Sequence, residues 1–294
     1  LDGEGELAQT EAKEAKNMPR EKGVDAGFGV EEVLVINLEK RSDRWSQLRA
    51  HVAEAVGEGA SASLSRVEGV DGEKLFRGFD GGETKEHLEV VRQFSTDTWD
   101  NSKARNPHQD HGWRAGVIGC AMSHLKAWRQ IADTVTQRGT QRGANSGANS
   151  GSNSSTARHR PVSPYDMFLI LEDDVRFSGD FAHRWPKVRE AAERDRSWDI
   201  LFLGNLDDRD FYGDEPDRLA PDLLLRLAPV GRTFGSGLFA YVLRPRGAQA
   251  LLDAAESSPI MQAVDWWVWE RLAVGEPHDL TRLVGLKASP ALAA

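Results

Sequence analysis

The sequence predicts an α/β protein in which a mostly parallel central sheet is flanked by helices. Two observations favour this fold class. Short apolar runs recur along the chain, and each is too short to span a membrane but suits a buried strand. Between these runs lie longer segments with apolar residues three and four positions apart, which is the spacing of one helix face. Strands that alternate with helices are typical of a mostly parallel sheet.

The first expected strand is Val33 to Ile36, and a helix follows it. Ser42 is the expected N-cap of that helix, whose apolar residues as far as Val52 fall on one face. A second helix is expected from about Val117 to Ala132, and its wide apolar face indicates burial. The remaining expected elements are strands at 167–171, 200–203 and 238–243 and a helix that begins at Pro245.

Two segments are set apart from this pattern. Residues 1–28 mix charged residues and glycine without apolar periodicity, so we expect a disordered lead-in. Residues 139–161 contain a near-repeat of Gly, Ala, Asn and Ser, which predicts a flexible low-complexity insertion. The rest, residues 29–294, is expected to form one domain that this insertion interrupts.

Composition excludes several classes of protein. The net charge is −9 and no block of Lys and Arg alternates with aromatic residues, so we expect no nucleic-acid partner. No run approaches the ~18 apolar residues of a transmembrane helix, so no membrane span is expected in this chain. The single cysteine, Cys120, excludes an internal disulfide, and we expect a small buried residue without chemistry.

The apolar run Met167 to Leu171 ends in three adjacent acids, Glu172, Asp173 and Asp174. Three carboxylates in a row repel one another unless a cation or hydrogen-bond donors compensate them. The carboxyl ends of strands are also where open α/β sheets bind ligands. The triplet therefore indicates a site for a divalent cation and a phosphorylated ligand, and the alternative is a solvated acidic turn. Which of the three binds the cation stays open.

Other segments, taken in chain order with the triplet, resemble glycosyltransferase family 25. This family includes bacterial lipooligosaccharide galactosyltransferases and animal collagen β-galactosyltransferases. The resemblance covers about residues 31–275 and implies a GT-A-like fold that uses nucleotide-activated sugars. The matching segments are Val35–Leu38 with Arg41 and Arg44, Arg66–Gly72, Gly119–His124, Ile170–Asp174 and Trp198–Leu201.

The resemblance implies roles for residues that follow the first strand. Asn37, Arg41 and Arg44 would bind the donor nucleotide, and guanidinium groups suit phosphate oxygens. The alternative for both arginines is a solvated first helical turn with pairing to Glu39 or Asp43. Arg44 is the stronger candidate, since it matches the second arginine of the family's asparagine-leucine-x-x-arginine-x-x-arginine pattern.

The same resemblance brings Ser123 and His124 to the donor site together with Glu172 and Asp173. His124 would bond a phosphate or orient a ligating carboxylate, and its alternative is a satisfied core histidine. Glu172, Asp173 and Asp174 would bind Mn²⁺ or another divalent cation such as Mg²⁺.

Asp265 is the candidate catalytic base. The collagen-modifying members of the family invert the sugar linkage, which requires a base to take the proton of the acceptor hydroxyl. The alternative is a carboxylate at a helix N-terminus with Trp266, Trp267 and Trp269 packed in the core.

The expected function is a metal-dependent galactosyltransferase that takes a UDP-sugar as donor and a saccharide or a hydroxylysine-type protein as acceptor. Two alternatives stay open: an inactive carbohydrate- or nucleotide-binding module, and a sugar-nucleotide hydrolase. Asn153-Ser154-Ser155 fits the glycosylation pattern, and the alternative is a chance match. With the insertion that contains it, this pattern slightly favours a secretory lumen over the cytoplasm, and the compartment stays open. The chain ends soon after Lys287, where the family's members continue, which is typical of a fragment or of an impaired copy.

Overall fold

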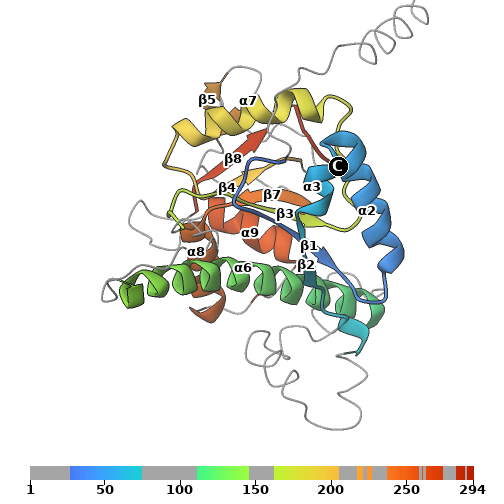
Figure 1. The fold of residues 1–294 in the computed structure, drawn as a ribbon. Helices are drawn as coiled ribbons and strands as arrows, with labels where there is room; N and C mark the ends of the chain where they lie inside the picture. The colour runs from blue at the N-terminus through green and yellow to red at the C-terminus, as the bar shows by residue number, and fades with distance from the viewer. Residues whose placement is uncertain are drawn as a thin grey trace, which may run out of the picture.

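The central feature of the computed structural model is one eight-stranded sheet, with the strand order β2-β1-β3-β7-β4-β8-β6-β5 (Figure 1). The structure describes residues 27–74, 111–145, 162–204, 217–220, 224–226, 237–257, 260, 263–273, 283–288 and 290–294. The strands are β1 (Glu32–Asn37), β2 (Leu64–Glu68), β3 (Phe168–Glu172), β4 (Ile200–Phe202), β5 (Asp217–Ala220), β6 (Leu224–Arg226), β7 (Ala240–Leu243) and β8 (Gly285–Ala288).

The sheet is mixed but mostly parallel. β1 pairs in parallel with β2 and β3, and β4 pairs in parallel with β8. β7 is antiparallel to β3 and β4, and β6 is antiparallel to β5 and β8. Two of the eight strands, β6 and β7, therefore run against the other six. The predicted α/β class with a mostly parallel sheet is confirmed and is consistent with a GT-A-like fold.

Helices cover both faces of the sheet. The helices are α2 (Ser42–Ala55), α3 (Glu58–Ala62), α6 (His111–Asn145), α7 (Phe181–Arg194), α8 (Pro245–Ser257) and α9 (Val264–Ala273). One core cluster joins the sheet to α6, α8 and α9, and a second joins it to α2, α3 and α7, on opposite sides in Figure 1. In β3, Phe168 and Ile170 belong to the first cluster, while Leu169 and Leu171 belong to the second. A continuous apolar strand is thus explained by burial on both faces.

Several boundaries differ from the sequence prediction. Ser42 is the first residue of α2 and not its N-cap, because Arg41 takes that position and no side chain caps the helix. α6 begins at His111 and continues to Asn145, so its last turns enter the segment predicted as a flexible insertion. Phe28 is 3% exposed and packs against Phe177 and Phe181, so the packed part of the protein begins before the predicted end of the lead-in.

The remainder of both special segments, residues 1–26 and 146–161, lies outside the described residues, and so does the glycosylation pattern at 153–155. Within the described part of the chain, the structure contains no helix of the length and apolarity needed to cross a bilayer.

Candidate active site

The candidate site lies at the carboxyl ends of β1 and β3, which are neighbouring parallel strands. Ile36 pairs with Glu172 in the sheet register, so Asn37 and the acidic triplet leave the sheet at the same edge. α2 begins five residues after Asn37, and its first turn brings Arg44 to this edge. The fold therefore brings residues more than a hundred positions apart in the sequence into contact.

Asp173 points back toward α2 and is nearly buried. Its Oδ2 accepts a hydrogen bond from Asn37 Nδ2 over 2.7 Å, and its Oδ1 accepts one from Arg44 Nη1 over 3.0 Å. Asn37 Nδ2 also donates to the carbonyl of Arg41, 2.9 Å away. Asn37 is 1% exposed, so it supports Asp173 from within the protein. The amide and the guanidinium together compensate the Asp173 carboxylate.

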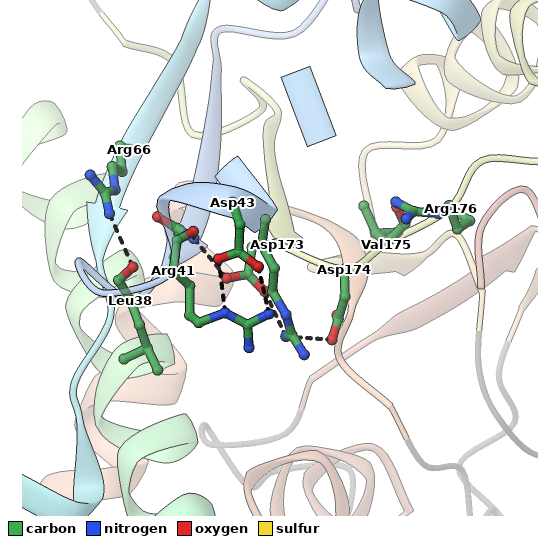
Figure 2. Close-up of polar contacts among 10 residues, drawn as sticks. Leu38, Arg41, Asp43, Arg66, Asp173, Asp174, Val175 and Arg176 are labelled. Atoms are coloured by element: carbon green, nitrogen blue, oxygen red, sulfur yellow. Dashed lines mark hydrogen bonds and ion pairs between the residues drawn. The ribbon is translucent and has the colours of Figure 1, made fainter. Parts of the chain in front are cut away.

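Asp174 is more open and shares the same arginine. Arg44 Nη1 donates to Asp174 Oδ2 over 2.8 Å. Figure 2 shows Asp174 beside Asp173. The pKa of Asp174 is nevertheless raised, first by burial and then by the negative charge of Glu172, while Arg44 opposes the shift. Arg44 thus does not fully offset the effects of burial and of Glu172 on Asp174.

Arg41 behaves differently from Arg44. Its Nε and Nη2 donate to the two carboxylate oxygens of Asp43 over 3.0 and 2.9 Å, at an exposed position (Figure 2). The hydrogen bond from Arg41 lowers the pKa of Asp43 to about 2. The pairing proposed as the alternative for both arginines therefore holds for Arg41, while Arg44 turns to the triplet.

Glu172 faces the other way, toward α6. Its Oε1 lies 3.2 Å from Nε2 of His124, which is fully buried. Nδ1 of the same ring lies 2.9 Å from the hydroxyl of Tyr241, and Trp128 Nε1 donates to that hydroxyl over 2.9 Å. Burial raises the pKa of Tyr241 well above its usual value. His124 is a satisfied core residue, as the alternative has it, and it also contacts a triplet carboxylate. Its part in donor binding stays a prediction.

Ser123 forms hydrogen bonds to the backbone within the fold. Its hydroxyl donates to the carbonyl of Gly119 over 2.6 Å and accepts the backbone N–H of Val70 over 2.8 Å. This pair of bonds fixes the loop after β2 against α6. Ser123 therefore shapes the wall of the site.

Two cavities adjoin at this edge. The first, of about 320 Å³, is lined by Arg41, Arg44, Ser123, His124, Glu172 and Asp173 among others, and is called the Arg44 cavity. The second, of about 350 Å³, is lined by Gly116, Val117, Cys120, Glu172, Leu238, Ala263, Val264 and Asp265, and is called the Asp265 cavity. Gly116, Cys120 and Glu172 line both. Glu172 thus stands at the shared wall.

Asp265 lies in the first turn of α9 and is held by backbone groups. Its Oδ2 accepts the N–H of Gly237 over 2.8 Å, and its Oδ1 accepts the N–H of Trp266 over 2.9 Å. Gly237 has a φ of 94°, a conformation that favours glycine. The helix-terminal reading of Asp265 is correct, and the residue also lines a cavity. Trp267 and Trp269 are core residues, whereas Trp266 is 55% exposed.

The prediction that Cys120 is buried was wrong, and the prediction that it has no chemistry stays a prediction. Cys120 is exposed and lines both cavities, because the helix face that carries it looks into the site. Surrounding protein atoms raise the pKa of its thiol, and the charge of Glu172 adds to this shift. A side chain on a concave wall is both reachable from the cavity and partly shielded from water. Its Sγ, a ring nitrogen of His124 and a carboxylate oxygen of Glu172 lie within 4.8 Å of one another.

Sequence reasoning missed Tyr241 and Trp128. The available signal was a tyrosine inside the apolar run 238–243, because a buried phenol needs a hydrogen-bond partner. It also missed Lys40 and Asp71, which form an ion pair of 2.7 Å and line the Arg44 cavity. The hydrogen bond from Lys40 lowers the pKa of Asp71.

Comparison with known proteins supports the resemblance noted from the motifs. The chain is 25% identical over 224 residues to a protein of Acanthamoeba polyphaga mimivirus that carries the name glycosyltransferase R655, a match covering 75% of this chain and 52% of that protein. It is 22% identical over 229 residues to human procollagen galactosyltransferase 2, covering 77% and 28%. It is 27% identical over 226 residues to human inactive glycosyltransferase 25 family member 3, covering 76% and 29%.

The chain therefore spans about half the length of the viral relative and under a third of the animal relatives. No protein-family model matches it. The relatives are named as glycosyltransferases, and some of them are named as inactive members.

Proposed function

We propose that this chain is a metal-dependent glycosyltransferase domain that moves a sugar, galactose, from a UDP-sugar to a hydroxyl of a glycan or protein acceptor with inversion. One observation carries the proposal. Glu172 stands between two adjoining cavities, of which one contains Arg44 and Asp173 and the other contains Asp265. A donor diphosphate in the first and an acceptor hydroxyl in the second would meet at this shared wall.

The residues at the end of β3 fit a hard divalent cation. Three adjacent carboxylates supply the oxygen ligands that Mn²⁺ and Mg²⁺ prefer. The pKa of Asp174 is raised first by burial and then by the negative charge of Glu172, and a bound cation would oppose both effects. We assign Asp174 as the principal ligand because its side chain is 52% exposed, with Glu172 and Asp173 as further ligands. A bound cation would stabilise the negative charge on the departing diphosphate.

Arg44, Asn37 and Asp173 would position the donor. Arg44 contacts Asp173 and Asp174 and lines the same cavity as Asp173, so a small rotation would bring its guanidinium to a phosphate oxygen. Arg41, which lines the same cavity, adds positive charge near the diphosphate. Ser123 and His124 form the wall that these groups face.

Asp265 would act as the base. The acceptor oxygen forms a bond to the anomeric carbon while the bond from that carbon to the diphosphate oxygen breaks. The hydroxyl proton passes to the Asp265 carboxylate, and UDP leaves with the electron pair. Backbone N–H groups of Gly237 and Trp266 hold the carboxylate in place during this transfer.

A second candidate is a binding module without catalysis on the same fold. It is favoured by the relatives named as inactive family members, to which the chain is up to 27% identical. It is also favoured by the contact of Arg44 with both Asp173 and Asp174, since a guanidinium already compensates these acids.

The deciding experiment measures UDP release by the full-length protein with Mn²⁺ and several UDP-sugars, in the presence of glycan and hydroxylysine peptide acceptors. We compare Asp174→Asn and Asp265→Asn with Asp253→Asn, which changes an exposed acid of α8 that lines neither cavity. The expected result is metal-dependent release that falls about 10²- to 10⁴-fold in Asp265→Asn. Asp174→Asn should require more Mn²⁺, and Asp253→Asn should resemble the wild type.

Other outcomes separate the alternatives. If no UDP-sugar is turned over but UDP binds with Mn²⁺, the binding module replaces the enzyme. If free sugar is the sole product despite a suitable acceptor, the protein is a sugar-nucleotide hydrolase.

A further inference from the structure

We infer that Tyr241 and Trp128, acting through His124, are positioning residues that hold the Glu172 carboxylate at the wall shared by the two cavities. The chain of contacts runs from Trp128 Nε1 to the Tyr241 hydroxyl, then to His124 Nδ1, and from His124 Nε2 to Glu172 Oε1. Its consequence is that His124 presents a proton at Nε2 and does not ligate a cation. Any effect of these contacts on turnover depends on the proposed function, whereas the position of the proton on the His124 ring does not.

The direction of these hydrogen bonds follows from the groups themselves. An indole N–H only donates, so the Tyr241 oxygen accepts from Trp128. A carboxylate oxygen accepts, so the contact between His124 and Glu172 places a proton on Nε2. In that tautomer Nδ1 is unprotonated and accepts the Tyr241 hydroxyl 2.9 Å away. Every donor in this series of four side chains therefore has an acceptor.

The opposite tautomer creates two unfavourable polar contacts between buried groups. With the proton on Nδ1, the Tyr241 oxygen accepts from both His124 and Trp128, and its own hydrogen loses the His124 acceptor. The lone pair of Nε2 also faces a carboxylate oxygen. His124 and Tyr241 are fully buried, so water does not supply the missing hydrogen-bond partners.

These hydrogen bonds connect α6 to the strands that carry the site. His124 and Trp128 lie one turn apart on α6, Tyr241 lies on β7, and Glu172 ends β3. Tyr241 pairs with Ile170 in the sheet, and the Glu172 N–H donates to the carbonyl of Phe239 over 2.8 Å. The backbone of Glu172 is thus fixed by β7, and its carboxylate is fixed by His124.

The same argument decides between a positioning role and a ligand role for His124. Cys120, His124 and Glu172 offer sulfur, nitrogen and oxygen atoms within 4.8 Å, a set that Zn²⁺ accepts. A protonated Nε2 has no lone pair to give. The Tyr241 hydroxyl therefore protects the shared wall from a soft metal ion, and without it Nε2 becomes available.

The test is the protonation pattern of the His124 ring in protein labelled with ¹⁵N-histidine. Long-range ¹H–¹⁵N NMR spectra report which ring nitrogen carries the proton, and His124→Gln identifies the signal. We expect a single Nε2–H tautomer in the wild type and a mixture with the Nδ1–H tautomer in Tyr241→Phe, which keeps the Glu172 contact but lacks the hydroxyl that faces Nδ1. Tyr165→Phe, which changes an exposed tyrosine, should leave the signal unchanged. An Nδ1–H tautomer in the wild type would overturn the inference, whether or not the protein is an enzyme.

Zinc binding provides a second measurement. We expect Tyr241→Phe to bind Zn²⁺ at least about 10-fold more tightly than the wild type, and Cys120→Ser to remove this gain. In the transferase assay, Tyr241→Phe should lower kcat about 10- to 100-fold with little change in KM for the UDP-sugar. Equal zinc affinity in wild type and Tyr241→Phe, with an unchanged kcat, contradicts the positioning role.

Discussion

Nη1 of Arg44 lies 2.8 Å from Oδ2 of Asp174, across 130 positions of sequence. The same nitrogen reaches Asp173 over 3.0 Å, so one guanidinium compensates two of the three acids. Arg41, three residues earlier, is paired with Asp43 on the surface. The two arginines of one motif therefore have different partners, and they make a matched pair for mutagenesis.

The first prediction concerns this pair. Arg44→Gln should weaken UDP binding in saturating Mn²⁺ by about 10- to 100-fold, since a hydrogen bond to a charged group contributes roughly 1.5–3 kcal/mol. Arg41→Gln should weaken it by less than about 5-fold, because an exposed pair contributes ~0–1 kcal/mol. Isothermal titration calorimetry of UDP measures both. Equal losses in the two variants would show that Arg44 has no special place at the donor site.

The sequence predicted the layers of the fold because its apolar pattern reports burial. Both Ile170 and Leu171 are completely buried, on opposite faces of the sheet, and this continuous run is typical of a central strand in a three-layer protein. The pattern does not report strand direction. β7 is as apolar as β3, yet it runs antiparallel to it, because direction depends on the connection that precedes a strand.

The sequence predicted the site residues that belong to short local motifs, but not the contacts that depend on the fold. The acids, Asn37 and Arg44 were found from short motifs, and the fold brings them together. Which acid each partner contacts is decided by the directions of three successive side chains at a strand end. Tyr241 was missed because its role depends on contacts with α6, more than a hundred residues earlier.

The second prediction compares two glycines of α6. A Cβ at Gly119 would lie 2.6 Å from the carbonyl oxygen of Val70 and 2.8 Å from the nitrogen of Gly72, while a Cβ at Gly116 would meet open space. Gly119→Ala should therefore lower the free energy of unfolding by about 1–3 kcal/mol. Gly116→Ala should raise it by roughly 0.5–1 kcal/mol, since alanine favours a helix. Chemical denaturation measures both, and a stable Gly119→Ala would contradict the close packing of α6 on this loop.

The third prediction separates two tryptophans of α9. Trp269 is buried and stacks on Phe202 with ring centroids 4.4 Å apart, so Trp269→Ala should lose about 3–5 kcal/mol of stability. Trp266 is 55% exposed and follows Asp265, so Trp266→Ala should change stability by less than about 0.5 kcal/mol.

Under the proposed function, Trp266 offers an aromatic face to a sugar at the acceptor side. Trp266→Ala should then raise KM for the acceptor and leave KM for the UDP-sugar unchanged. Initial-rate kinetics with each substrate varied in turn measure this split. An acceptor KM equal to that of the wild type would assign Trp266 no part in acceptor binding.

The last prediction concerns His51, away from the site. Its Nε2 accepts the backbone N–H of Phe177 over 2.8 Å, and its ring stacks on the Phe177 ring. The pKa of His51 is lowered from 6.5, first by burial and then by the positive charge of Arg176, while Glu54 opposes the shift. A proton on Nε2 would remove the acceptor of that N–H, which agrees with the direction of the shift.

Because the folded pKa of His51 lies below the unfolded value, the unfolded chain binds more protons in the interval between them. The contribution of His51 to stability is therefore fully present above pH 6.5 and is lost as the pH falls through the lower, folded value. Urea unfolding of the wild type should show a free energy that declines over this interval, and His51→Gln should show a smaller decline. His183→Gln, which removes an exposed histidine of α7, serves as the control and should keep the wild-type slope. A His51→Gln profile parallel to that of the wild type would mean that His51 is protonated equally in the folded and unfolded chain, and that its bond to Phe177 does not affect its titration.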